Sequence, residues 1–288
     1  MEINGHTRLC GLIGNPVEHT LSPVIHNTVA EEMHDNLVYA PFHVEQGNLQ
    51  KAIAGAYSLN VLGLNVTVPY KQAVIPCLDC VEGLAEKIGA VNTLVRTENG
   101  FRGYNTDMMG LYRAMEEEGI AFEAEDMILL GAGGAARAAA FLCAEKGAKR
   151  VYLLNRSYEK AAVLAEEVNR AYERDCILPM ALSEYEKLPE EKMTAIQGTS
   201  AGLYPNTEDA VILDPAFYQH ISKAYDLIYK PEETRFMKLV KEAGGEAYCG
   251  IRMLLYQGII AYELFLDTKV PENVIRKVSA LLQEKVKG

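Results

Sequence analysis

The stretch from Met127 to Ala136 constrains the fold of this chain more than any other. It begins with the apolar strand Met127–Leu130, continues as Gly131-Ala132-Gly133-Gly134-Ala135-Ala136, and leads into a helix of small residues that ends near Lys146. This strand, glycine loop and helix fit the pattern G-x-G-x-x-G/A. Glycines let the backbone approach a pyrophosphate, and the helix N-terminus adds free N–H groups and a partial positive charge. The middle of the chain is therefore predicted to form a parallel Rossmann sheet that binds a dinucleotide.

The end of the next strand predicts which dinucleotide is bound. The strand Arg150–Leu154 is followed by Asn155-Arg156-Ser157, where NAD-binding domains usually carry an acidic residue for the ribose 2′-hydroxyl. Arg156 can hold a 2′-phosphate through a planar, charge-assisted contact, and Lys160 can add a second cation. We therefore expect NADP (NADPH) as the cofactor. Its predicted ligands are Gly131, Ala132, Gly133, Gly134, Ala135, Asn155, Arg156, Ser157 and Lys160.

The length and the order of the elements predict two α/β domains. At 288 residues the chain exceeds the size at which a single core usually stops growing. Strands and helices alternate before Met127, where Asn99-Gly100 predicts a hairpin, and the pattern after Ile251 is purely helical. We expect an N-terminal α/β substrate domain, residues 1–106, and a Rossmann dinucleotide-binding domain, residues 107–251. C-terminal helices in residues 252–288 are expected to return to the substrate domain and complete it.

Composition argues against several kinds of partner. The net charge of −11 disfavours nucleic acid and anionic membranes, since both require clustered basic surface. No apolar run reaches the roughly 18 residues needed to cross a bilayer, and Met1–Arg8 lacks the apolar core of a signal peptide. We therefore expect a cytoplasmic protein without a membrane partner. Cys77 and Cys80 have metal-like spacing, but no second Cys or His pair completes a tetrahedron, so no metal is expected.

The run Leu62–Lys71 predicts a polar pocket at the end of a strand. It has the β-branched composition of a strand that stops at Pro69 and then presents Lys71. Side chains alternate along a strand, so Asn65 and Thr67 share a face near its carboxyl end. An amide and a hydroxyl suit a small, oxygen-rich substrate, and the lysine is able to move a proton.

Two helix starts carry further candidate groups. Asp107 lies at the start of one helix, where the dipole favours its ionised form, and a carboxylate close to Lys71 would favour the protonated lysine. Ser22-Pro23 opens another helix, with Ser22 expected as the N-cap. A hydroxyl-lined loop at a helix start can receive a carboxylate without a bulky cation. Lys71 and Asp107 are thus the candidate proton-transfer pair, and the loop from Thr20 to Ser22 is the candidate carboxylate site.

In their order along the chain, these motifs resemble the shikimate dehydrogenase family over essentially the whole length. The resemblance is carried by Gly14–Asn27, Asn65–Lys71, Gly89–Thr93, Tyr104–Asp107, the glycine loop, Asn155–Ser157 and Met253–Gln257. It implies a reversible NADP-dependent reduction of 3-dehydroshikimate to shikimate, a step in aromatic amino-acid biosynthesis. The protein would act on this small-molecule substrate as a monomer or homodimer. The resemblance implies Lys71 and Asp107 as catalytic residues, Gly250 as a further cofactor ligand, and as substrate ligands Thr20, Ser22, Asn65, Thr67, Asn92, Tyr229 and Gln257.

Three alternatives stay open at this point. A quinate/shikimate dehydrogenase using NAD, or both cofactors, is disfavoured by Arg156, although the sequence does not judge the fit of quinate. A folate-type dehydrogenase shares the two-domain plan, but the hydroxyl-rich loop at Thr20 disfavours its large substrate. A non-catalytic NADP-sensing module would be expected to lack Lys71 or Asp107, and both are present.

Some residues leave more than one interpretation. Thr20 replaces the serine that is more usual in this family. Arg252 occupies a segment where small residues are typical, so it is expected either at the rim of the active site or in solvent. His19 and His26 are interpreted as pocket-shaping or hydrogen-bonded residues and not as metal ligands.

Overall fold

The computed structural model describes residues 2–287, and the chain forms two compact units. The first consists of Met1–Gly110 and Leu255–Glu284, and the second chiefly of Leu111–Leu254. Two helices, α4 (Thr106–Glu117) and α9 (Ile251–Leu266), run from one unit into the other. The expected boundaries, 106/107 and 251/252, fall in the first turns of these helices, whereas the units divide inside them.

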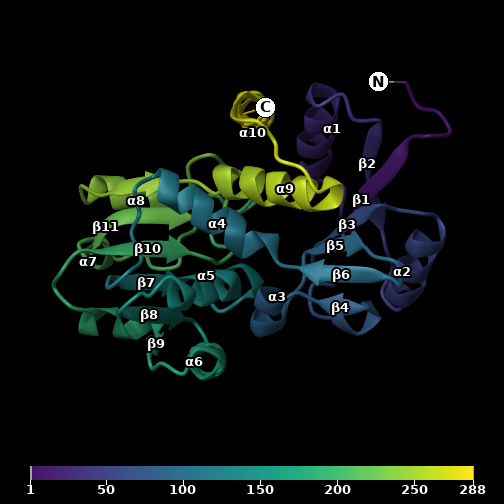
Figure 1. Cartoon of the computed structure of the whole chain (residues 1–288). Coiled ribbons are helices and arrows are strands. Elements are labelled where there is room, and N and C mark those ends of the chain that lie inside the picture. Colours follow the sequence, from purple (N-terminus) through teal and green to yellow (C-terminus); the bar gives the residue numbers. More distant parts are fainter. Residues whose placement is uncertain (1, 288) are drawn as a thin grey trace. The chain divides into compact units, whose positions relative to one another are not determined.

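The first unit is built on a mixed six-stranded sheet with the order β2-β1-β3-β5-β6-β4 (Figure 1). Strands β1, β2 and β3 pair in parallel, whereas β3, β5 and β6 pair antiparallel. The β5–β6 pair confirms the hairpin predicted at Asn99-Gly100. The strands are β1 (Arg8–Gly14), β2 (Leu37–His43), β3 (Gly63–Val66), β4 (Cys80–Val81), β5 (Thr93–Arg96) and β6 (Phe101–Tyr104). The helices are α1 (Ser22–Glu32), α2 (Leu49–Ser58), η1 (Ile75–Cys77), α3 (Gly83–Ile88) and α10 (Glu272–Lys287).

The second unit is built on a parallel six-stranded sheet with the order β12-β11-β10-β7-β8-β9. The order reverses between β10 and β7, as in dinucleotide-binding folds, and the predicted α/β class is confirmed. The strands are β7 (Asp126–Leu130), β8 (Arg150–Asn155), β9 (Ile177–Ala181), β10 (Met193–Gln197), β11 (Ile221–Asp226) and β12 (Glu246–Tyr248). The helices are α5 (Gly134–Glu145), α6 (Tyr158–Tyr172), η2 (Leu182–Lys187), α7 (Pro215–Tyr218) and α8 (Arg235–Glu242).

Strand β9 was not predicted from the sequence. It contains Pro179, and proline cannot donate a ladder hydrogen bond, so strand patterns with an internal proline are usually discounted. In the structure β9 pairs only with β8 and is therefore an edge strand, where one proline N is tolerated. Pro41 occupies the same kind of position in β2, which pairs only with β1.

Candidate active site

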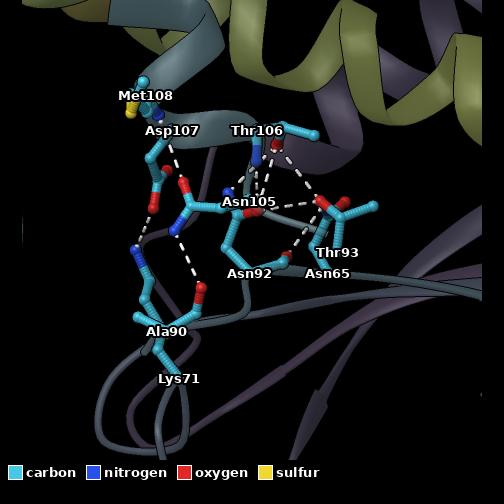
Figure 2. A network of polar contacts seen from close by, with 9 residues as sticks. All are labelled: Asn65, Lys71, Ala90, Asn92, Thr93, Asn105, Thr106, Asp107 and Met108. Atoms are coloured by element: carbon cyan, nitrogen blue, oxygen red, sulfur yellow. Dashed lines mark hydrogen bonds and ion pairs between the residues drawn. The ribbon is translucent and has the colours of Figure 1, made fainter. Parts of the chain in front are cut away.

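Lys71 and Asp107 lie together in the first unit, as the resemblance implied. Lys71 follows a tight turn after β3, in which the Tyr70 N–H donates to the Thr67 carbonyl at 2.9 Å. Asp107 lies in the first turn of α4. The Lys71 Nζ is 2.6 Å from the Asp107 Oδ2, and the two side chains are only 32% and 16% exposed (Figure 2). This pair places a proton donor or acceptor next to a fixed carboxylate.

The start of α4, which carries Asp107, is fixed by two residues of the Tyr104–Asp107 motif to which the sequence analysis assigned no role. The Asn105 Oδ1 accepts from the Met108 N–H at 3.2 Å, and its Nδ2 donates to the Ala90 carbonyl at 2.9 Å (Figure 2). The Thr106 N–H donates to the Asn92 Oδ1 at 2.7 Å. The available signal was a pair of polar residues at the start of a helix, Asn105 directly before it and Thr106 as its first residue.

The amides of Asn92 and Asn65 belong to one buried network (Figure 2). The Asn65 Nδ2 donates to the Thr93 Oγ1 at 2.9 Å and to the Asn92 carbonyl at 3.3 Å. The Asn92 Nδ2 donates to the Thr106 Oγ1 at 3.0 Å. Asn65 is 4% exposed and Asn92 is 3% exposed. Both N–H groups of Asn65 are therefore already used, so it supports its neighbours, and its direct contact with substrate stays a prediction.

The Thr20 and Ser22 hydroxyls lie next to each other at the start of α1. The Thr20 Oγ1 donates to the Ser22 Oγ at 3.1 Å and accepts from the Ser22 N–H at 3.2 Å. The predicted N-cap role of Ser22 is wrong, because the N-cap is Leu21 and Ser22 is the first helical residue. The Ser22 hydroxyl makes no capping bond and is available for other partners.

Gln257 reaches the same unit through a close approach of two helices. A Cβ placed on Gly110 of α4 would lie 2.6 Å from the Gln257 backbone N on α9, so only glycine permits this packing. Asp107 lies one turn before Gly110 on α4. The approach therefore carries Gln257 to the part of α4 that holds Asp107. Thr67, the remaining predicted ligand in this unit, is half-buried just after β3.

The cofactor candidates lie in the second unit around the ends of β7 and β8. Gly131 has a φ of +103°, and a Cβ there would lie 2.7 Å from the Thr199 Cγ2. No atom lies within 4 Å of the Cβ position at Gly133 or Gly134, where α5 begins. The open backbone at the start of this helix of 12 residues suits a pyrophosphate. These residues therefore fit a dinucleotide.

The loop after β8 presents the two cations assigned to the 2′-phosphate. Ser157 caps α6 by accepting from the Lys160 N–H at 3.4 Å, and the Asn155 Nδ2 donates to the Ser157 carbonyl at 2.8 Å. Arg156 and Lys160 are both exposed. Gly250 packs against the end of β11 and the residue after it, since a Cβ there would lie 3.1 Å from the Asp226 carbonyl oxygen and 2.4 Å from that of Leu227. Its place as a cofactor ligand stays a prediction.

Tyr229 lies in the second unit, in the segment after β11, apart in the chain from the other predicted substrate ligands. This segment is held by Asp226, which sequence reasoning missed. The Asp226 carboxylate is fully buried and accepts from the Thr234 hydroxyl at 2.6 Å, the Ile228 N–H at 3.0 Å and the Gln197 Nε2 at 3.3 Å. A carboxylate at the end of a strand was the signal.

Asp226 predicts an unusual pH dependence of stability. Burial raises the pKa of its carboxyl from 3.8 to about 7, against the opposing effect of its hydrogen bonds. The folded protein therefore holds a proton that the unfolded chain releases, and this contribution to stability is lost as the pH rises from about 4 through about 7. We expect Asp226→Asn to gain stability relative to wild type as the pH rises from 5 to 8.5, by on the order of a few kcal/mol. Thermal unfolding at both pH values checks this, and parallel curves for the two proteins would contradict it.

Arg252 forms ion pairs with two carboxylates, and its expected place at the rim of the active site stays a prediction. Its Nη1 lies 2.7 Å from Glu117 Oε2 and its Nε lies 3.1 Å from Glu118 Oε1, all within the second unit. The residue therefore ties the start of α9 to the end of α4.

Within residues 2–287, no helix is long and apolar enough to cross a membrane.

Comparisons with known proteins agree with this geometry. Residues 12–94 match the model of the shikimate dehydrogenase substrate binding domain, residues 114–205 that of shikimate/quinate 5-dehydrogenase, and residues 250–278 that of the shikimate 5′-dehydrogenase C-terminal domain. A shikimate dehydrogenase (NADP(+)) of Desulforamulus reducens is 41% identical over 283 residues, covering 96% of each chain.

Two solved structures are similar over nearly the whole chain. One is a shikimate dehydrogenase in complex with NADP+, with a TM-score of 0.89, 33% identity and coverage of 99% of this chain and 98% of that one. The other is a shikimate 5-dehydrogenase from Listeria monocytogenes in complex with shikimate and NAD. It has a TM-score of 0.89, 30% identity and coverage of 96% and 98%.

Proposed function

The chain belongs to the shikimate dehydrogenase family, and we propose that it catalyses the reversible NADPH-dependent reduction of 3-dehydroshikimate to shikimate. It is an oxidoreductase acting on a secondary alcohol. The observation that carries this proposal is the 2.6 Å contact between Lys71 and Asp107 at the edge of a buried amide network. In this reading, the activity serves aromatic amino-acid biosynthesis.

Lys71 is the group that moves the proton. When bound, NADPH supplies a hydride to the carbonyl carbon of the substrate. The Lys71 ammonium gives a proton to the carbonyl oxygen as negative charge develops there, and Asp107 holds the ammonium in place. In the reverse direction neutral Lys71 takes the hydroxyl proton. Because oxidation releases a proton, a higher pH favours it.

The hydroxyls at the start of α1 are the proposed carboxylate ligands. The Thr20 Oγ1 and the Ser22 Oγ lie 3.1 Å apart, and the Ser22 hydroxyl does not cap the helix. Ring hydroxyls are assigned to Lys71 and Asp107 and to four further side chains of the same unit, Asn65, Thr67, Asn92 and Gln257. Tyr229, from the second unit, is assigned to the carboxylate as well.

The second unit is proposed as the NADP-binding domain. The backbone at Gly133 and Gly134 would hold the pyrophosphate, and Arg156 with Lys160 would hold the 2′-phosphate. The first unit would hold the substrate. We further propose that the enzyme works in the cytoplasm as a monomer or homodimer.

An absorbance assay of the nicotinamide tests the function. Shikimate and quinate are each offered with NADP and with NAD, and the largest kcat/KM is expected for shikimate with NADP. Turnover of quinate with NAD, with little turnover of shikimate with NADP, would replace this proposal by a quinate dehydrogenase. Nucleotide binding without turnover of either acid would indicate the sensing module.

A further inference from the structure

Tyr39 of β2 is fixed at three separate points. Its backbone is held by the Asn27 side chain, which donates to the Tyr39 carbonyl at 3.0 Å and accepts from the Tyr39 N–H at 2.8 Å. Its ring stacks on His26, with centroids 4.0 Å apart and planes inclined by 2°. Its hydroxyl lies 2.7 Å from the Asn65 Oδ1. The first two contacts would hold a phenylalanine equally well, so the hydroxyl needs a separate explanation.

The partners of Asn65 set the direction of this hydrogen bond. A backbone carbonyl only accepts, so the Asn65 group that faces the Asn92 carbonyl is the Nδ2. The Oδ1 then faces Tyr39, and the Tyr39 hydroxyl must donate to it. Burial raises the pKa of the Tyr39 hydroxyl, so the hydroxyl stays protonated and keeps its proton for this bond.

These bonds form one continuous chain. It starts at the Tyr39 hydroxyl, which donates to Asn65, and continues from the Asn65 Nδ2 to the Thr93 Oγ1. The Thr93 hydroxyl donates to the Asn92 Oδ1 at 3.1 Å, and the same oxygen accepts from the Thr106 N–H at the start of α4. Tyr39 is thereby connected to the helix that carries the proton-transfer pair.

His26 provides a flat, uncharged surface for the Tyr39 ring. It is completely buried, and burial lowers the pKa of its imidazole to about 3. The imidazole therefore stays neutral at any pH well above 3. The expectation that His26 shapes the pocket is consistent with this stacking.

We propose that Tyr39 is a positioning residue of the substrate site, acting through Asn65. By donating to the Asn65 Oδ1 it fixes the orientation of that amide, and with it the Thr93 and Asn92 groups that are hydrogen-bonded to it. This proposal rests on the function proposed above. Tyr39 itself need not touch the substrate, since it is 2% exposed and its hydroxyl is already bonded.

The test is Tyr39→Phe, which removes only the hydroxyl. The Asn65 Oδ1 would lose its donor in a site that is 4% exposed. We expect the KM for shikimate to rise about tenfold, with a smaller change in kcat and no change in the KM for NADP. A merely structural role would lower the melting temperature without this selective rise in one KM.

Tyr262→Phe is the matched control. Tyr262 is fully buried in the same unit, and its hydroxyl donates to the Asp35 carboxylate at 2.6 Å, away from Asn65. This variant loses a comparable buried hydrogen bond, but its KM for shikimate should stay within about twofold of wild type. Equal KM values for the two variants would overturn the proposal.

A double-variant comparison tests whether Tyr39 acts through Asn65. In an Asn65→Ala background, Tyr39→Phe should change the KM for shikimate by less than about twofold. A further tenfold rise would show that Tyr39 acts by another route and would overturn the proposal. Wild-type protein serves as the reference, because a failure of wild type to turn over shikimate would overturn the proposed function and not the role of Tyr39.

Discussion

Lys71→Ala is expected to lower kcat by about 10²–10⁴, because it removes the group that gives the proton to the developing alkoxide. The Lys71 ammonium is held 2.6 Å from the Asp107 carboxylate, so one defined donor is lost. Water that enters in its place lacks both the fixed position and the charge. Nucleotide affinity should stay near normal, since the glycine loop and Arg156 lie in the second unit.

The measurement is steady-state turnover of shikimate with NADP, together with a direct titration of NADP. Lys51→Ala is a suitable control, because Lys51 is an exposed lysine on α2 of the same unit. Lys51→Ala changes the net charge by the same amount as Lys71→Ala and should leave kcat unchanged. Residual activity of Lys71→Ala within about fivefold of wild type would remove the proton-transfer role, since such transfer is worth at least about a hundredfold.

Arg156→Ala is expected to weaken NADP binding by about 10- to 100-fold and to leave NAD binding nearly unchanged. A guanidinium that contacts the 2′-phosphate makes charge-assisted hydrogen bonds that NAD cannot receive. Arg156 is exposed at the end of β8, directly before the cap of α6, so its loss should not disturb the fold. The selectivity for NADP over NAD should fall by the same factor.

Titrations of both nucleotides against wild type and variant check this expectation. Arg170→Ala is the control, because Arg170 is an exposed arginine near the other end of α6, where it pairs with Glu166. It lowers the positive charge equally and should leave both affinities unchanged. Equal weakening of NADP and NAD by Arg156→Ala would mean that Arg156 does not contact the extra phosphate.

Much of the fold could be predicted from local pattern. The apolar strand before Gly131 and the small-residue helix after it gave the Rossmann unit, and the Asn99-Gly100 dipeptide gave the β5–β6 hairpin. Strand β9 was missed because Pro179 breaks the usual strand pattern. Only the sheet order shows that β9 is an edge strand, where that proline costs no ladder bond.

The chemistry of the candidate site could be predicted from the sequence, but the residues that hold its side chains in place could not. Lys71 and Asp107 could be chosen because Lys71 follows the end of a predicted strand and Asp107 lies at the start of a predicted helix. The roles of Asn105 and Thr106 could not be predicted, because they hold the helix start through hydrogen bonds to Ala90 and Asn92, which lie more than ten residues away in the chain. The N-cap of α1 was predicted at Ser22 but lies one residue earlier, at Leu21, because cap geometry depends on backbone angles and not on residue type alone.

Local sequence patterns were enough to predict the α/β class, the glycine loop and the residue types that can bind an anion or move a proton. These depend on periodicity and short motifs, which are local. Tertiary structure decided that Lys71 meets Asp107, that Gly110 lets Gln257 approach α4, and that Tyr39 reaches Asn65. Each of these contacts joins segments far apart in the chain. Their distances depend on how whole strands and helices pack, which no local pattern specifies.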